Sequence, residues 1–458
     1  MPEPSMPAGG AGTERVAIVG AGLAGCLLAT LLARRGIDVT VYERREDPRV
    51  TAPERGRSIN LAISARGLEA LAQVGLRELS LSRALPMHGR MVHSRDGQQS
   101  FRPYSADGTH AINSISRAEL NLALLEVSER THGVCVRSGH RLSELDMATG
   151  ELSFETADGQ RTARAGIVLA ADGAYSAARR SVTFRQGFTF SQDYLQHGYK
   201  ELTVPARDGE FALDPDALHI WPRGSSMMIA LPNLDRSFTC TLFWTGAEFA
   251  ALRGPGQIRD HFRRDYPDVA ALIPDLVDDY LHNPIGSLAT IRCWPWVHHG
   301  AGCTLALVGD AAHAIVPFYG QGANCALEDC IEIDRCLSET DGDWTTALTR
   351  YQQRRKANCD AIADMALDNF IEMRDRVNSR AFQAKTAARH ALERRLAGHY
   401  VSQYELVSFS TVPYAQIPDR IRKQDLAMAL AAAGALGLGG AAVALAAAAS
   451  RVTRRKSP

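Results

Sequence analysis

The chain has 458 residues, which is long enough for two joined domains with a sizeable hydrophobic core. Hydrophobic residues make up 45% and charged residues 22%, as in an ordinary globular protein. The 51 basic and 51 acidic residues cancel, so we exclude nucleic acid as a partner. Nine scattered cysteines without a CxxC pair predict no metal site and no disulfide framework, and they indicate reduced thiols in a protein that faces the cytosol.

The N-terminal part of the chain predicts a nucleotide-binding unit. Residues 1–14 are rich in Pro and Gly and predict a disordered tail. A strand at 15–20, a helix at 23–35 and a strand at 38–43 then form a βαβ unit with parallel strands.

A GxGxxG motif, made of Gly20, Gly22 and Gly25, joins the first strand to the helix. These glycines permit a tight turn, close approach of a pyrophosphate and close packing of helix on strand. Glu43 ends the second strand, where a carboxylate binds ribose hydroxyls. The motif predicts a dinucleotide site and leaves FAD and NAD open.

Two later segments extend this site. A buried-type strand at 167–171 ends at Asp172, and a helix begins near Ser176; a simple turn capped by the Asp172 side chain is the alternative interpretation. A strand at 304–308 ends at Gly309-Asp310, where Asp310 can accept a hydrogen bond from a ribityl hydroxyl. We expect His313, three residues later, to pack beside the strand end rather than to catalyse.

The turn at 320–324 opens another helix. Its N–H groups, beginning with that of Gly322, would face the O2/N1 edge of a flavin and stabilise the anionic reduced ring.

The predicted fold is α/β, with a Rossmann-like FAD-binding domain in two parts, 15–186 and 293–335. Residues 187–292 alternate apolar and polar side chains, which predicts an inserted substrate domain built on an antiparallel sheet. Residues 336–425 form a C-terminal helical region.

The segment 426–450 holds 25 residues without a charge, between basic flanks. As a helix it would be about 37 Å long, and a bilayer core is about 30 Å thick. It predicts a membrane anchor, and an alanine-rich helix packed on the protein is the alternative.

The three nucleotide segments, in this order, resemble the FAD-binding pattern of the flavin-dependent aromatic hydroxylases, the group that includes p-hydroxybenzoate hydroxylase. Four stretches resemble the kynurenine 3-monooxygenase family more closely: GRSINLA at 56–62, GRMVHS at 89–94, YLQHGYKEL at 194–202 and IVPFYGQG at 315–322. The resemblance covers about residues 15–418, and the C-terminal tail also has a counterpart in membrane-bound members. Ala177-Ala178 and Ala323 depart from the usual residues without removing a group that the chemistry needs.

The resemblance implies an FAD-dependent monooxygenase that converts L-kynurenine to 3-hydroxy-L-kynurenine with NAD(P)H and O2, in tryptophan degradation by the kynurenine pathway. NADPH would be a co-substrate, because the sequence has no second GxGxxG for it. A C4a-hydroperoxide of the reduced flavin would supply the oxygen, so no catalytic side chain is expected. The alternatives are a flavin hydroxylase of another phenol or polyketide, a membrane flavin dehydrogenase that reduces a quinone, and a membrane-tethered binding protein without activity.

The resemblance also implies site residues. Besides the motif glycines and Asp172, the implied FAD contacts are Ala24, Glu43, Arg45, Ala62, Arg117, Leu142, Asp310, Ala323 and Asn324. The implied substrate contacts are Arg90, Tyr104, Asn369 and Tyr404.

The residue types suit an amino-acid substrate that carries an aniline ring. An arginine such as Arg90 can bind the α-carboxylate through two hydrogen bonds, and Tyr104 can add a hydroxyl donor. A helix places Asn369, Glu372 and Met373 on one face, with Glu372 available to the ammonium group. Phe318 and Tyr319 are candidates for an aromatic wall beside the flavin.

Overall fold

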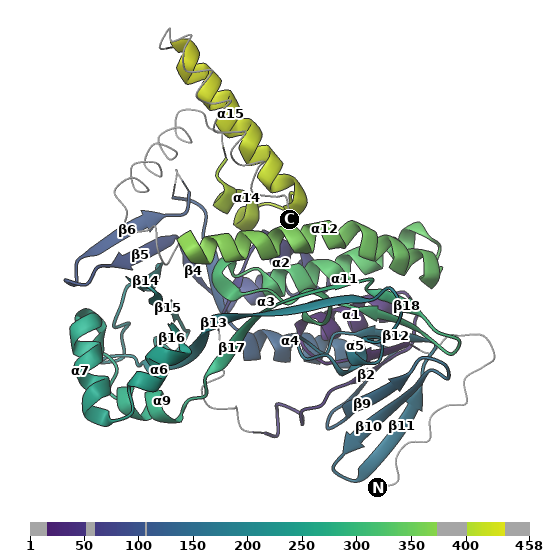
Figure 1. The fold of residues 1–458 in the computed structure, drawn as a ribbon. Helices are drawn as coiled ribbons and strands as arrows, with labels where there is room; N and C mark the ends of the chain where they lie inside the picture. Colours follow the sequence, from purple (N-terminus) through teal and green to yellow (C-terminus); the bar gives the residue numbers. More distant parts are fainter. Residues whose placement is uncertain (1–15, 52–59, 106–107, 373–400, 436–458) are drawn as a thin grey trace.

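The computed structural model describes residues 16–51, 60–105, 108–372 and 401–435 (Figure 1). The predicted tail at 1–14 lies outside these residues. The described residues contain a six-stranded sheet in the order β18-β19-β12-β1-β2-β8, parallel except for β18. Its strands are β1 (Val16–Val19), β2 (Val39–Tyr42), β8 (Val134–Arg137), β12 (Ile167–Ala170), β18 (Val297–His299) and β19 (Thr304–Leu307). The four strands predicted for the nucleotide domain are confirmed as β1, β2, β12 and β19. Their short runs of apolar residues are typical of parallel strands that are covered on both faces.

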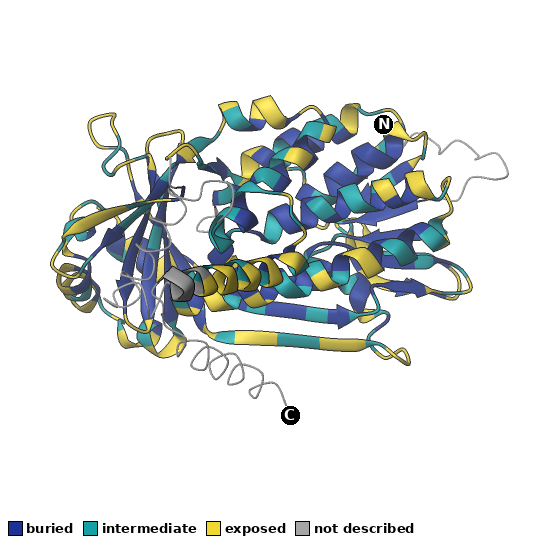
Figure 2. Ribbon diagram, turned by 90° about the horizontal axis from the view of Figure 1, so that it is seen from above, coloured by how far each residue is buried: buried dark blue, intermediate teal, exposed yellow. Residues whose placement is uncertain are grey.

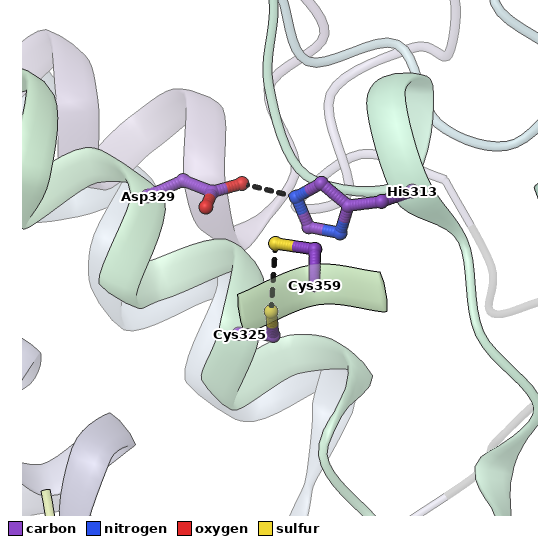
Figure 3. Close-up of side chains that lie close together, drawn as sticks. All are labelled: His313, Cys325, Asp329 and Cys359. Carbon is purple, nitrogen blue, oxygen red and sulfur yellow. Dashed lines mark hydrogen bonds and ion pairs between the residues drawn. The ribbon is translucent and has the colours of Figure 1, made fainter. Parts of the chain in front are cut away.

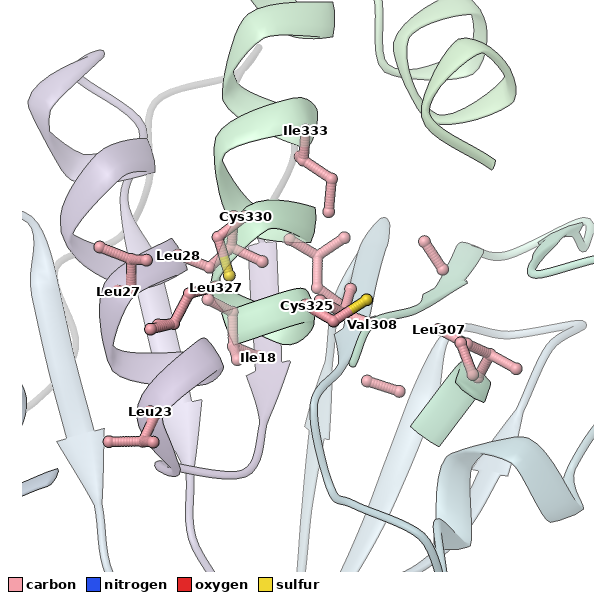
Figure 4. Close-up of a cluster of buried hydrophobic side chains, with 14 of the residues drawn as sticks. Ile18, Leu23, Leu27, Leu28, Leu307, Val308, Cys325, Leu327, Cys330 and Ile333 are labelled. Carbon is pink, nitrogen blue, oxygen red and sulfur yellow. The ribbon is translucent and has the colours of Figure 1, made fainter. Parts of the chain in front are cut away.

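Helices cover this sheet and form the main core. α1 (Leu23–Arg34) contacts α4 (Arg117–Arg130) and α11 (Gly322–Glu339), and α11 contacts α12 (Trp344–Ile371). Figure 4 shows Leu27 and Leu28 of α1 beside Leu327 of α11, above Ile18 of β1, and all four side chains are fully buried. This packing fixes the start of α1 and the start of α11 relative to the strand ends.

A second sheet has seven described strands in the order β17-β13-β16-β15-β14-β5-β6. Five come from the predicted antiparallel region: β13 (Thr189–Val204), β14 (Ala217–Arg223), β15 (Ser226–Pro232), β16 (Phe238–Thr245) and β17 (Gly286–Trp294). The other two, β5 (Gly89–His93) and β6 (Gln99–Pro103), were not expected in this sheet. β5 pairs in parallel with β14, more than a hundred residues away, and such a pairing leaves no local pattern in the sequence.

Helices on one side of the second sheet enclose a separate core around Trp221, Trp244 and Phe262. These helices are α6 (Gly246–Ala251), α7 (Pro255–Asp265), α8 (Pro267–Ala270) and α9 (Leu276–His282). Two small sheets complete the strands: β3 (Asn60–Ile63), β7 (Ile112–Ser116) and β4 (Leu85–Met87), and β11 (Gly159–Arg164), β10 (Glu151–Thr156) and β9 (Arg141–Asp146).

The remaining described helices are short, apart from the last. They are α2 (Ala65–Gln73), α3 (Arg77–Ser82), α5 (Ala177–Arg180), α10 (Asp310–His313), η1 (Pro317–Tyr319), α14 (Gln403–Phe409), η3 (Tyr414–Gln416) and α15 (Ile417–Ala435). α15 projects from the body of the molecule (Figure 1), and most of its residues from 418 to 428 are exposed (Figure 2). Among the described residues we find no helix with the length and hydropathy needed to cross a bilayer, and positions 436–450 of the predicted anchor lie outside them.

A buried histidine on β18 makes stability depend on pH. Burial lowers the pKa of His298 to about 4, so the ring stays neutral in the fold. An unfolded histidine titrates near pH 6.5, so the stabilisation is present above pH 6.5 and is lost as the pH falls to 4, by up to about 3 kcal/mol. We expect His298→Gln to flatten this acid limb in urea unfolding measured from pH 7 to 4. His299→Gln, at the exposed neighbour, should leave it unchanged, and parallel curves for wild type and His298→Gln would contradict the assignment.

Candidate active site

The first part of the site is the turn between β1 and α1. Gly20 has φ +102°, and a Cβ there would lie 2.5 Å from Ala171 O. A Cβ on Gly25 would lie 1.9 Å from Gly20 O, so both positions require glycine. Gly22 caps α1 and is different, because a Cβ there would meet no atom within 4 Å. The open side of Gly22 and an α1 N-terminus without a side-chain cap suit a bound pyrophosphate.

Glu43 lies beside this turn, one residue after β2. Its Oε2 accepts a hydrogen bond from Ala21 N at 2.8 Å, and its Oε1 accepts from Arg45 N at 3.0 Å and Nε at 2.8 Å. Burial opposes ionisation, but the hydrogen bonds and the charge of Arg45 outweigh it and hold the pKa of Glu43 below its ordinary value. Glu43 is therefore a fixed carboxylate, and its Oε2 keeps one lone pair that a ribose hydroxyl could use.

The Asp172 segment lies next to the third segment. Asp172 Oδ2 accepts from Ala177 N at 2.7 Å and Ala178 N at 3.2 Å, so the predicted alternative, a capped turn, is present. The other oxygen, Oδ1, is buried without a hydrogen-bond partner in the described chain, and burial raises the pKa of this carboxyl. Arg179 donates to Ala311 O at 2.7 Å and so links the two segments.

The third segment differs slightly from its prediction. β19 ends at Leu307, and Asp310 is the first residue of α10 rather than the end of the strand. Its side chain is half-buried. His313 is buried, with Nε2 2.5 Å from Asp329 Oδ2, which is the structural position expected for it.

Asn324 holds the start of α11 in place. Its side chain accepts from Ser64 N at 3.0 Å and donates to Ala62 O at 2.9 Å and Gly320 O at 2.8 Å. The residue is fully buried, so it positions the Gly322 turn rather than offering its amide to a ligand. α11 has no side-chain cap, which leaves its first N–H groups for an electron-rich ring edge.

The other implied FAD residues fall into three groups. Ala24, Ala62 and Ala323 are half-buried at the starts of α1 and α11 and on β3. Arg117 is exposed at the start of α4. Leu142 is buried in the hydrophobic core of the sheet β9–β11, opposite Phe154, so only its backbone is available to a ligand.

An arginine surrounded by tyrosines forms the second half of the site. The Arg90 guanidinium carbon lies 4.6 Å from the ring centre of Tyr404 and 5.7 Å from that of Tyr104. The rings of Tyr104 and Tyr404 stack at 4.9 Å, and Tyr319 lies 5.7 Å from Tyr404. The fold thus brings together four predicted residues from widely separated parts of the chain.

This cluster has unsatisfied hydrogen-bond donors. Arg90 Nε and Tyr104 OH are buried and have no hydrogen-bond partner in the part of the chain that the structure describes. Burial raises the pKa of Tyr104 and of Tyr319, so both phenols keep their protons. A half-buried guanidinium with an unpaired, buried Nε–H and one neutral phenol without a partner are complementary to a carboxylate.

A cavity of about 280 Å³ lies beside Tyr319. Its lining is Tyr319, Asp368, Asn369, Ile371, Glu372 and Gln403. Sequence reasoning missed Asp368, which the i, i+4 spacing to Glu372 could have found, and Gln403, for which the sequence holds no local signal. Met373 lies outside the described residues.

Asn369 also shapes the aromatic wall. Its Nδ2 donates to Phe318 O at 2.6 Å, and the Phe318 ring stacks on Phe370 at 4.1 Å. These contacts fix η1, and with it Tyr319, against the end of α12.

Comparisons with known proteins agree with this geometry. Residues 13–366 match the family described as "FAD binding domain". The chain is 47% identical over 407 residues to the kynurenine 3-monooxygenase of Myxococcus xanthus, over 88% of this chain and 87% of that protein. The enzyme of the same name from Sus scrofa is 39% identical over 402 residues, which cover 87% and 84% of the two chains.

Solved structures show the same fold. 2-Methyl-3-hydroxypyridine-5-carboxylic acid oxygenase superimposes with a TM-score of 0.63 at 20% identity, over 86% of this chain and 95% of that chain. p-Nitrophenol 4-monooxygenase from Pseudomonas putida gives a TM-score of 0.63 at 18% identity, over 83% and 94%.

Proposed function

The chain belongs to the kynurenine 3-monooxygenase family, and we propose that it hydroxylates L-kynurenine to 3-hydroxy-L-kynurenine with FAD, NAD(P)H and O2. The observation that supports this substrate is the half-buried cluster of Arg90 and three tyrosines, which lies beside a cavity lined by two acidic side chains. A site with a cation and phenols at one end and carboxylates at the other suits a substrate that bears both a carboxylate and an ammonium group.

Two separate sets of residues would bind the two ligands, FAD and the substrate. We assign the pyrophosphate of FAD to the Gly22 turn, its ribose to Glu43, its ribityl chain to Asp310 and its ring edge to the Gly322 turn. We assign the substrate carboxylate to Arg90 and Tyr104, and the ammonium group to the acidic residues Asp368 and Glu372.

The side chains position the substrate and exclude water. When bound, FAD would supply the redox chemistry, namely the acceptance of hydride and the activation of O2. Amino-acid side chains do not carry out these reactions. Tyr319 closes the cavity wall, supported by the neighbouring Phe318 ring that stacks on Phe370, and would keep the aryl ring dry and oriented. The aniline nitrogen activates its own ring, so the proposal requires no general base.

The test is NADPH oxidation by the purified yellow protein with and without L-kynurenine, with O2 uptake and products measured by mass spectrometry. We expect 3-hydroxykynurenine to form in proportion to the NADPH consumed. NADPH oxidation coupled to a quinone without oxygen insertion, or turnover of a simple phenol but not of L-kynurenine, would overturn the proposal in favour of the alternative enzymes.

Removal of the Asp310 carboxylate should weaken FAD binding. Asp310→Ala loses an acceptor for a hydroxyl hydrogen bond, which corresponds to about 1–3 kcal/mol or about 5- to 150-fold in Kd. The checks are the flavin-to-protein absorbance ratio after gel filtration and titration of the apoprotein with FAD. Asp260→Ala, at an exposed carboxylate on α7, is the control. A fully yellow Asp310→Ala protein would contradict the assignment.

We propose that the C-terminal segment 426–450 attaches the protein to a membrane. Support comes from its lack of charge and from Leu426 and Leu430 of α15, which are 56% and 57% exposed. Full-length protein should sediment with membranes and resist extraction by salt, and a chain ending at residue 425 should not. Release of the full-length protein by salt alone would exclude an inserted anchor.

A further inference from the structure

Two cysteines lie in contact between α11 and α12, behind the start of α11. Cys325 is in the first turn of α11 and Cys359 is in the middle of α12, and their sulfur atoms are 3.6 Å apart. Figure 3 shows the two thiols meeting below the imidazole ring of His313. A disulfide requires an S–S distance of about 2.05 Å, so the sulfurs must approach by about 1.5 Å.

The charges around the pair distinguish the two sulfurs. Arg355 Nη2 lies 3.2 Å from Cys325 Sγ and 3.8 Å from Cys359 Sγ. The hydrogen bond from Cys359 lowers the pKa of Cys325, burial opposes this, and the cations Arg355 and His313 add to the lowering. Burial raises the pKa of Cys359. The nearer guanidinium and the lowered pKa favour Cys325 as the nucleophilic sulfur, with Cys359 as the hydrogen-bond donor.

A metal ion does not suit the same cluster, although ligand atoms of His313, Cys325, Asp329 and Cys359 all lie within 4.8 Å of one another. Arg355 Nε donates to Asp329 Oδ1 at 2.7 Å, while Gly309 N and His313 Nε2 contact Asp329 Oδ2. Both carboxylate oxygens and Nε2 of His313 are thus already engaged, and the Arg355 guanidinium lies beside the sulfurs. A second buried cation here would be repelled by Arg355.

We propose that Cys325 and Cys359 form an oxidisable dithiol, which hydrogen peroxide converts to a disulfide between α11 and α12. The Cys325 thiolate attacks one peroxide oxygen, the O–O bond breaks, and a sulfenic acid and hydroxide form. The Cys359 sulfur then attacks the sulfenic sulfur, an S–S bond forms and water leaves. Two thiols lose two electrons in all, and one hydrogen peroxide becomes two waters. The proposal does not depend on the identity of the aromatic substrate.

The position of the pair gives the link a consequence for the site. Cys325 directly follows Asn324, which holds the Gly322 turn, and Cys359 is ten residues before Asn369 on the same helix. A disulfide would therefore join the helix that begins at the predicted flavin edge to the helix that ends at the substrate cavity.

The experiment treats the purified FAD-loaded protein with hydrogen peroxide, blocks remaining thiols under denaturing conditions and maps peptides by mass spectrometry. We expect a cross-linked Cys325–Cys359 peptide and a mass loss of two hydrogens, reversed by dithiothreitol. In Cys359→Ser, the sulfenic acid at Cys325 should be trapped by dimedone. Exposed Cys135 is the internal reference for oxidation.

Two results would overturn the proposal. One is oxidation of Cys135 while Cys325 and Cys359 remain reduced. The other is a stoichiometric metal ion in the isolated protein that blocks both thiols. If Cys359→Ser does not fold, peptide mapping of the unmodified chain still decides between these outcomes.

Discussion

Replacement of Arg90 by methionine is expected to raise the KM for L-kynurenine by about 30- to 700-fold while FAD stays bound. The change leaves the substrate carboxylate without its cation in a buried site, at a cost of about 2–4 kcal/mol. Methionine fills a similar volume, so the tyrosine stack around it should persist. Steady-state kinetics with L-kynurenine, together with the flavin absorbance of the variant, measure both effects.

Arg102 offers a matched control for this variant. It lies directly opposite Arg90 on the neighbouring strand β6, so Arg102→Met removes the same charge from nearly the same place. Of these two arginines, Arg90 is the one that lies against tyrosine rings of the cluster in the described structure, so KM should change little in the control. Equal increases in KM in the two variants would show that the overall positive charge near the site, rather than a direct contact, attracts the substrate. An unchanged KM in Arg90→Met would refute the carboxylate contact.

The second large effect is expected on stability. Arg355→Met should lower the free energy of unfolding by about 3–5 kcal/mol, because it breaks a buried ion pair and leaves Asp329 with His313 as its one cationic partner among the described residues. Arg355 pairs with fully buried Asp329 at 2.7 Å and with Glu328 at 2.6 Å. Urea unfolding of the wild type and the variant, followed by tryptophan fluorescence, gives the difference.

The adjacent Arg354 provides the control for that measurement. It pairs with Glu332 and Glu339 on the exposed side of α12, so Arg354→Met should cost less than about 1 kcal/mol. Equal losses of stability in Arg354→Met and Arg355→Met would show that burial does not increase the contribution of the Arg355–Asp329 pair to the free energy of unfolding.

Local patterns predicted the parallel sheet and the glycine turn well. Runs such as 16–19 and 167–170 are buried on both faces, and the positive φ of Gly20 is a property that only glycine satisfies easily. The pairing of β5 with β14 and the place of Gln403 in the cavity depend on contacts distant in sequence, so no local pattern marks them. The shift of Asp310 from strand end to helix start is a boundary difference of a few residues.

The residues expected to contact the substrate were identified from the resemblance to a family rather than from the physical properties of the local sequence. Nothing in the neighbourhood of Arg90 or Tyr404 along the chain separates them from surface residues. A buried network of polar side chains shows the same limit. His93 lies 2.6 Å from Asp268 and 2.8 Å from His219, and no local pattern along the chain marks these contacts.

The strand pairing of β5 has a practical consequence for protein engineering. The insertion at 187–292 looks like a module that could be exchanged between homologues to alter substrate choice. β5 and β6, however, come from outside it, and the hairpin that bears Arg90 completes its sheet only by pairing with β14. A chimera that swaps the insertion alone would join a foreign sheet to a native hairpin, so recombination should exchange 85–105 together with 187–294.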